Sequence, residues 1–266
     1  MVQSDYLMPS IWYGEKNSSG DISLLKESIT KLTTEKECVI LINDLLKLGD
    51  FTAKSLLIQL LNTATDENVM NLCIRLFCSV ASHQDLLNNE NLLFLSNVSE
   101  DNADTFASCA LYTLSYDVIP YLLAMLEEWE DTNVEETIRN TLDIMLNYSD
   151  TLDEKAPVDE IGNLYLDYIK GINNGKYYYY MEPVFPGELA KKLVEKAVIS
   201  LKNKDMIKTN VIPSLLSVWS GIKSPVEYNT IVTDEKFKDV LNYIDVLSKM
   251  DWEKGMKYFY GYSINE

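Results

Sequence analysis

The stretch DENVMNLCIRLFCSV, residues 66–80, carries the pattern that decides the fold. Its apolar residues recur every three or four positions, which places them on one face of an α-helix. These residues are Val69, Cys73, Leu76 and Val80. The pattern therefore predicts an amphipathic helix that buries one side.

Two segments with a similar pattern precede this helix. The first runs from Cys38 to Leu48 and is followed by Gly49, a residue that favours the left-handed cap of a helix. Asp50 can then cap the second segment, residues 51–62, which carries four leucines. We expect antiparallel helices joined by short turns.

The helix pair recurs along the chain. Asn68, Asn102 and Asn133 each lie in a short acidic turn between two apolar segments, at intervals of 34 and 31 residues. The residues eight, nine and twelve positions after each Asn lie in the second helix of each pair. Their spacing predicts that they share the face that points into the core. A repeat of this length is typical of helical solenoids, and the tetratricopeptide and ankyrin signatures are absent. Residues 35–150 resemble HEAT-like repeats in this layout.

The sequence thus predicts an all-α fold in three parts. Residues 1–20 are expected to form an N-terminal cap segment. Residues 21–150 are expected to form a HEAT-like array of antiparallel helix pairs, which is an α-solenoid. Residues 151–266 are expected to form a less regular helical part, packed on the repeats as one continuous domain.

Local signals predict further element boundaries. Capping-box patterns pair Thr34 with Glu37, Thr132 with Glu135, and Ser224 with Glu227. In the last part we expect helices at residues 158–172, 188–202, 207–219 and 235–250. The stretch from Lys176 to Phe185 is expected to form an extended loop or a short hairpin.

The charge of the chain is uneven. The whole chain has 23 basic and 41 acidic residues, a net charge of −18, and residues 1–169 hold 9 basic and 29 acidic residues, a net charge of −20. Within Glu127–Glu160, 12 acidic residues stand against 2 basic ones. This sign is wrong for a protein that follows a phosphate backbone or an anionic membrane, so we expect neither as a partner. It suits a basic protein partner.

The densest acidic turn supplies the candidate residues for binding such a partner, which are Glu127, Glu128, Glu130, Asp131, Glu135 and Glu136. A solvated helix face is the plainer interpretation of any single carboxylate here. We expect no metal, because the EF-hand spacing is absent. Trp129 lies in this turn, but it continues the apolar stripe of Leu122 and Leu126, which favours a place in the core.

Four consecutive tyrosines, Tyr177, Tyr178, Tyr179 and Tyr180, form a second candidate contact surface. Successive residues of an extended segment point to opposite faces, so some of these side chains should be exposed and suited to recognition. The alternative is that one pair packs on a neighbouring helix and the other pair lies in water. The aromatic residues between Trp252 and Tyr262 are expected to cover the ends of the last helices.

Little in the sequence supports catalysis. His83 is the single histidine and is expected at the C-terminal end of a helix, where a cation is favourable. Hydrolase, nucleotide-binding and zinc-protease motifs are absent, so we predict a protein without enzymatic activity or cofactor. HEAT-like DNA glycosylases are an enzymatic alternative, but the chain has only two arginines to line a DNA-binding groove.

Targeting signals are not apparent. The first 13 residues lack the pattern of a secretory signal, and no apolar stretch is long enough to span a bilayer. Four cysteines, Cys38, Cys73, Cys78 and Cys109, lie in apolar helical segments and are expected to be reduced core residues. These features predict a cytoplasmic protein.

The segment Ser10-Ile11-Trp12-Tyr13-Gly14-Glu15-Lys16 resembles the opening motif of immunity protein 47, a bacterial family from polymorphic toxin systems. The resemblance implies a cytoplasmic antidote that binds a cognate toxin tightly and blocks its active site, without chemistry of its own. Many such toxins act on nucleic acids and are basic, which agrees with the acidic repeats. The motif itself either contacts the toxin or tucks under the first repeat as a cap.

We therefore expect an immunity protein that occludes a basic toxin by steric and electrostatic means. The alternative is a helical-repeat scaffold or regulatory adaptor for another cellular protein. An antidote is encoded beside its toxin and rescues growth from that toxin alone, whereas an adaptor has a housekeeping partner.

Overall fold

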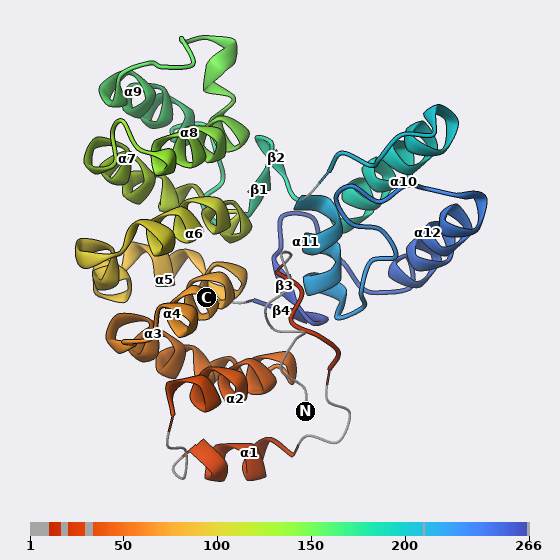
Figure 1. The fold of residues 1–266 in the computed structure, drawn as a ribbon, viewed down its shortest axis with the longest axis horizontal. Helices are drawn as coiled ribbons and strands as arrows, with labels where there is room; N and C mark the ends of the chain where they lie inside the picture. Colours follow the sequence, from red (N-terminus) through yellow and green to blue (C-terminus); the bar gives the residue numbers. More distant parts are fainter. Residues whose placement is uncertain (1–10, 17–20, 30–33, 210, 265–266) are drawn as a thin grey trace.

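The computed structural model describes residues 11–16, 21–29, 34–209 and 211–264. Within these residues the protein is mostly helical, as the sequence predicts (Figure 1). The α-helices of the first part, which we call the array, are α1 (Ile22–Ile29), α2 (Glu35–Lys47), α3 (Lys54–Thr63), α4 (Glu67–Val80), α5 (His83–Leu87), α6 (Glu100–Ala110), α7 (Ile119–Glu128), α8 (Asn133–Leu146) and α9 (Val158–Ile169).

Helices α2, α4, α6 and α8 form one layer of the array (Figure 1). Each contacts the next along the layer, and α3 and α7 pack on the other side. The positions predicted to face inward from the second helix of each pair are all buried, which are Leu76, Phe77, Val80, Ala110, Leu111, Leu114, Thr141, Leu142 and Met145. The apolar period of the sequence therefore locates the core of the array.

Side-chain caps explain where several helices begin. The Asp66 carboxylate accepts hydrogen bonds from the Asn68 and Val69 amides in the first turn of α4. Thr34 accepts from the amide of Glu37 at the start of α2, as predicted. Beyond the end of α2, Gly49 has φ = +84°, in the left-handed region that glycine adopts without strain.

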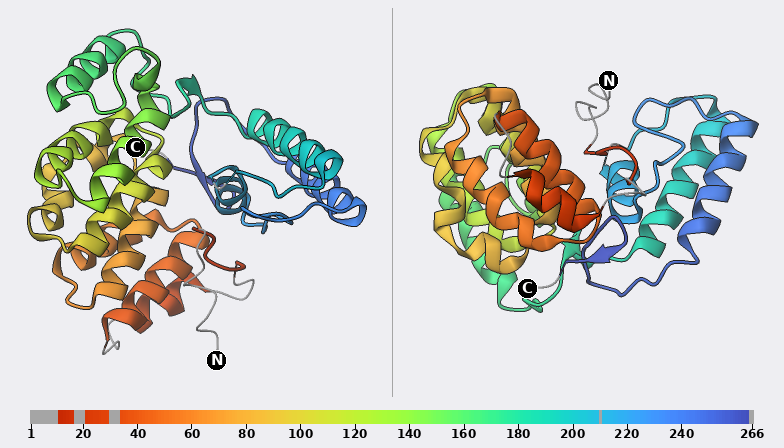
Figure 2. Two further views of the ribbon diagram at one scale, coloured as in Figure 1. Left: turned by 45° about the horizontal axis from the view of Figure 1, so that its top comes forward. Right: turned by 90° about the horizontal axis from the view of Figure 1, so that it is seen from below.

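Beyond α9 the chain forms two hairpins and three more helices. These elements are β1–β2 (Tyr178–Tyr179 and Glu182–Pro183), α10 (Pro186–Asn203), α11 (Val211–Ser220), α12 (Asp234–Leu247) and β3–β4 (Tyr258–Phe259 and Tyr262–Ser263). Figure 2 shows α10–α12 as a lobe beside the array. This C-terminal lobe packs around α11, all of whose residues are buried.

Three predictions about helix starts are wrong at least in part. Thr132 does precede α8, as predicted, but its hydroxyl donates to the Trp129 carbonyl instead of capping the helix. Ser224 begins no helix, because it lies in the loop between α11 and α12 and donates to the Val226 carbonyl. The helix predicted at 207–219 begins at Val211, since the preceding Ile207 shares backbone hydrogen bonds with the loop at 229–230.

The two hairpins have the same layout 80 residues apart. Strand β1 pairs Tyr178 with Pro183, and β3 pairs Tyr258 with Ser263. The turn residues Tyr180 and Tyr260 have similar left-handed φ values of 49° and 51°. In both, the first tyrosine hydroxyl accepts a hydrogen bond from the backbone amide five residues earlier. The predicted hairpin is confirmed. The aromatic residues expected to cover the ends of the last helices form the second hairpin, in which the Tyr260 amide donates to the Val218 carbonyl in the last turn of α11.

The apolar residues of the N-terminal motif are buried against β3–β4 and α4, whereas Glu15 and Lys16 are exposed. Ile11, Trp12 and Tyr13 are each no more than 5% exposed. Tyr13 Oη lies 3.2 Å from Ser79 Oγ on α4, and Tyr260 Oη donates to the Gly14 carbonyl at 2.6 Å. Burial leaves these side chains little surface to offer a partner, whereas Ser10 lies outside the described residues.

Candidate functional site

The acidic turn, Glu127, Glu128, Glu130 and Asp131, joins α7 to α8 at the surface. All four residues are exposed, and none of their carboxylates pairs with a residue that the structure describes. Unpaired carboxylates produce a negative potential that a cationic partner can neutralise. The turn is therefore a negatively charged part of the protein surface.

Trp129 lies within this turn and packs on the core. Its side chain is only partly exposed and contacts the buried cluster, as the stripe with Leu122 and Leu126 predicts. Its indole Nε1 is buried and has no acceptor among the described residues. Trp129 thus holds the acidic turn against the hydrophobic core.

A second acidic feature, the acidic hollow, lies along α8 and has a volume of about 440 Å³. Its charged lining residues are Glu135, Glu136, Asp143, Glu154, Arg139 and Lys155. Arg139 Nε lies 2.7 Å from Glu135 Oε1, and this hydrogen bond lowers the pKa of Glu135. Glu136 is exposed and makes no ion pair within the described ranges. The hollow is therefore negative, with one of its cations already engaged.

The four tyrosines divide between the core and the surface. Tyr177 and Tyr179 are buried, at 3% and 7% exposure, so their predicted role as contact residues is not supported. Tyr178 is half-buried, and Tyr180 at the tip of the hairpin is 49% exposed. Burial and the nearby charge of Asp143 both raise the pKa of Tyr180. The fold thus brings one tyrosine of the predicted surface close to α8 and its acidic residues.

A further cavity of this region, the central groove, lies between the array and the C-terminal lobe. It has a volume of about 580 Å³ and is lined by α4, α6 and α8 on one side, and by α11 and residues 227–229 on the other. Arg75, Tyr112 and Tyr228 lie in its wall, and Tyr228 is 54% exposed. Arginine and tyrosine are enriched at binding hot spots. Asn140 lines both the groove and the acidic hollow, so the two adjoin on α8.

Sequence reasoning missed the central groove, because its two walls come from distant parts of the chain. Arg75 on α4 and Tyr228 in the loop before α12 have no local pattern that links them. The one signal for the groove in the sequence is that the chain has only two arginines. A charged side chain that is removed from water needs a partner of opposite charge, so each arginine marks a position where such a partner is expected.

The sequence of residues 7–264 matches the protein family described as immunity protein 47. The chain belongs to the immunity protein 47 family. The match covers both the array and the C-terminal lobe, so it extends far beyond the motif at Ser10–Lys16 that carries the sequence resemblance. No curated protein and no solved structure matches the chain.

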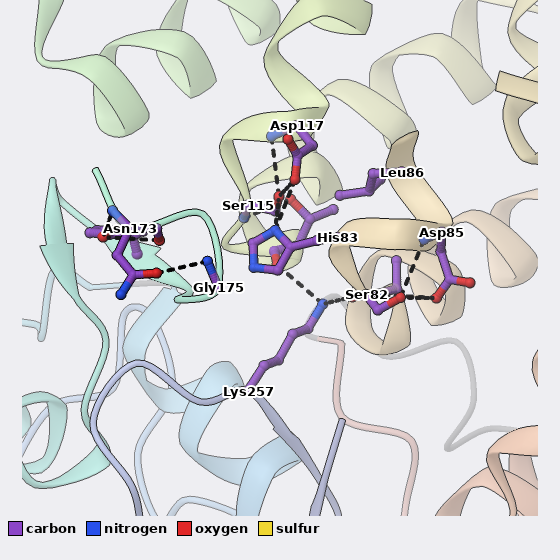
Figure 3. Close-up of polar contacts among 12 residues, drawn as sticks. Ser82, His83, Asp85, Leu86, Ser115, Asp117, Asn173, Gly175 and Lys257 are labelled. Atoms are coloured by element: carbon purple, nitrogen blue, oxygen red, sulfur yellow. Dashed lines mark hydrogen bonds and ion pairs between the residues drawn. The ribbon is translucent and has the colours of Figure 1, made fainter. Parts of the chain in front are cut away.

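In this immunity protein 47 family member, the buried His83 and Ser115 form a polar trio with the half-buried Asp117 (Figure 3). Ser115 Oγ and Asp117 Oδ2 both lie 2.8 Å from His83 Nδ1, and the Ser115 hydroxyl donates to Asp117. A nucleophilic serine would instead contact the other ring nitrogen, Nε2. The predicted helix-end cation is wrong, because His83 begins α5 after the cap at Ser82.

Lys257 lies near this trio in the family member's fold (Figure 3). Its side chain is fully buried, and its Nζ donates to the carbonyls of Cys78, Ala81 and Thr113 at 2.9, 3.0 and 3.3 Å. Burial lowers the pKa of Lys257 to about 7. The carbonyls of Cys78 and Ala81 belong to the C-terminal end of α4, where a cation is favourable. Lys257 therefore joins the last hairpin to the array.

The described part of the chain contains neither a metal-ligand cluster nor a membrane-spanning helix. No three of its His, Cys, Asp or Glu side chains are grouped as a metal site would require. None of its helices is long and apolar enough to cross a membrane. The cysteines are free, with Cys73, Cys78 and Cys109 buried and Cys38 half-buried, so the predicted core position is confirmed for three of them.

Proposed function

We propose that this protein binds a cognate toxin and neutralises it by covering its active site or its substrate path. The toxin is basic, and it docks on the acidic turn and the acidic hollow, with Tyr180 at the edge of the contact. The observation that carries this proposal is a set of exposed carboxylates that pair with no cation among the described residues, which are Glu127, Glu128, Glu130, Asp131 and Glu136. A partner of opposite charge is attracted to such a surface at long range, and the charge pairs then fix its orientation.

The architecture suits this role if residues 35–146 act as a HEAT-like solenoid. We infer this arrangement from the stacked layer of α2, α4, α6 and α8. Such arrays present extended surfaces to protein partners. The array and the C-terminal lobe act as one unit, because Lys257 and the N-terminal motif join them, and the protein works in the cytoplasm by binding, without a cofactor.

Co-expression tests the proposal directly. The protein is produced together with the product of the adjacent toxin gene, and growth rescue and co-purification are measured. Rescue with a stable complex is the expected result. No rescue and no complex with the toxin would contradict the proposal and favour the scaffold or adaptor alternative.

Charge reversal tests the docking surface. The double variant Glu128→Lys/Glu130→Lys changes the net charge by +4, and Asp251→Lys/Glu253→Lys makes the same change at two exposed residues of the C-terminal part. We expect the first variant to slow association by about tenfold at low salt, and the second to have a much smaller effect. Equal effects of the two variants would show that only the overall charge matters.

A further inference from the structure

Arg75 on α4 lines the central groove without an internal acceptor. Its guanidinium forms no ion pair or hydrogen bond with any described residue. The other arginine of the chain, Arg139, donates to the Glu135 carboxylate and to the Ala156 carbonyl. A guanidinium presents five donors in a planar fork that matches a carboxylate. The donors of Arg75 therefore lie at a cavity and are not bonded to any acceptor that the structure describes.

The groove around Arg75 has the composition of a pocket for a small polar group. Its neutral polar lining residues are Ser108, Thr137, Asn140, Thr141, Ser214 and Asn229. The carboxylate of Glu227 also lies in the lining, but it pairs with Lys223 at 3.2 Å. Glu227 thus leaves the charge of Arg75 unneutralised.

We propose that Arg75 receives a carboxylate of the toxin, from an Asp or Glu side chain that enters the central groove. The basic surface of the toxin covers the adjoining acidic hollow at the same time, because both cavities meet at Asn140. The assignment rests on the proposed function. It adds one contact in which this protein supplies the positive charge and the toxin supplies the negative charge. Because the rest of the docking surface is negative, this contact fixes the orientation of the toxin.

The charge of the protein favours a single carboxylate over a free phosphate or a nucleotide. Residues 1–169 carry a net charge of −20, so a small ligand with two or more negative charges is repelled from this region. An Asp or Glu side chain brings one negative charge, on a partner whose other charges are attracted. Tyr112 and Tyr228 provide aromatic faces to enclose the inserted side chain.

Arginine side-chain spectra test this contact, because the chain contains two arginines. In protein labelled with ¹⁵N-arginine, the two Nε–H signals are assigned with the Arg75→Lys variant. The purified product of the adjacent toxin gene is then added to saturation. We expect the Arg75 signal to shift as the complex forms, while the Arg139 signal stays near its free position as an internal reference.

A charge-matched pair of variants tests the energetic role of Arg75. Arg75→Gln and Lys170→Gln each remove one positive charge, and Lys170 is exposed at the surface. If only the overall charge mattered, both variants would bind a basic toxin slightly more tightly. We expect Arg75→Gln to bind about tenfold or more weakly instead, because it removes a charge-assisted hydrogen bond. Circular dichroism melts confirm that both variants fold.

The outcomes separate this inference from the proposed function. A saturated complex in which the Arg75 signal has not moved, or Arg75→Gln binding as tightly as Lys170→Gln, overturns the Arg75 contact and leaves the toxin complex standing. Inorganic phosphate that shifts the Arg75 signal at submillimolar concentration shows a small-anion pocket, which contradicts the assignment. If no complex forms with the toxin, the proposed function fails and the Arg75 contact fails with it.

Discussion

Trp12 and Tyr260 stack on each other with ring centroids 5.4 Å apart and an interplanar angle of 13°, so the two ends of the chain meet in one aromatic contact. Tyr260 also donates its hydroxyl hydrogen bond to Gly14. The N-terminal motif and the last hairpin therefore pack on each other, and together they connect the array to the C-terminal lobe.

Trp12→Ala is expected to destabilise the protein by about 3 kcal/mol or more, because it removes a large buried side chain and its stacking partner's contact. Urea unfolding followed by circular dichroism measures the change. Leu24→Ala serves as a control at a residue that is 63% exposed, where little change is expected. Normal stability of Trp12→Ala together with lost toxin binding would instead show that the motif contacts the toxin.

Lys257→Met is expected to destabilise the fold by about 3 kcal/mol, since it leaves buried carbonyl acceptors without a donor. Lys254→Met is the control, because Lys254 is close in sequence but lies at the surface with Glu188. Denaturant midpoints of the two variants give the comparison. A Lys257→Met protein as stable as the control would contradict the role of Lys257 in joining the hairpin to the array.

The stability of the protein is expected to depend on pH through Lys257. Burial lowers its pKa from 10.5 to about 7, so above pH 7 the unfolded chain binds a proton that the folded protein has lost. The contribution of this group to stability therefore rises with pH from about 7 upward and is constant below that range. The difference in unfolding free energy between the wild type and Lys257→Met, measured from pH 6 to 9, should grow with pH. A constant difference would show that Lys257 stays protonated.

Gly49→Ala is expected to destabilise the protein by about 1–3 kcal/mol. Gly49 has φ = +84°, and a Cβ atom there would lie 2.8 Å from the ring of Tyr262. Gly162→Ala is the matched control within α9, where an added Cβ meets only Leu123 Cδ1 at 3.8 Å. Since alanine favours a helix, this control should be stabilised by about 0.5–1 kcal/mol. Thermal unfolding of both variants measures the effect, and equal melting temperatures would contradict the close approach of Tyr262.

The helical core could be predicted from the sequence because it depends on local periodicity. The inward positions after Asn68, Asn102 and Asn133 are buried, since a 3.6-residue period sets the faces of each helix wherever it packs. The capping box at Thr132 was predicted wrongly, because the competing Trp129 carbonyl lies outside the pattern. Local spacing cannot show which of two acceptors a hydroxyl meets.

Contacts between distant segments could not be predicted. The second hairpin is specified by its burial against α4 and α11, and no local signal distinguishes it from a helix cover. The sequence does not predict the central groove for the same reason, because its walls belong to the array and to the C-terminal lobe, which are distant in the sequence. Because side chains of an extended segment alternate between two faces, the sequence predicts that not all four tyrosines are buried. It does not predict that Tyr177 is one of the buried ones, since this follows from its stacking on His83, a tertiary contact.

Hydrogen exchange of the complex with the adjacent toxin gene product tests the central claim most directly. The account predicts slower amide exchange at residues 127–143 and 227–229, relative to the free protein, and a smaller protection at 150 mM salt than at low salt when toxin is limiting. A tight complex that protects only other surfaces, such as the outer faces of α10 and α12, would contradict it.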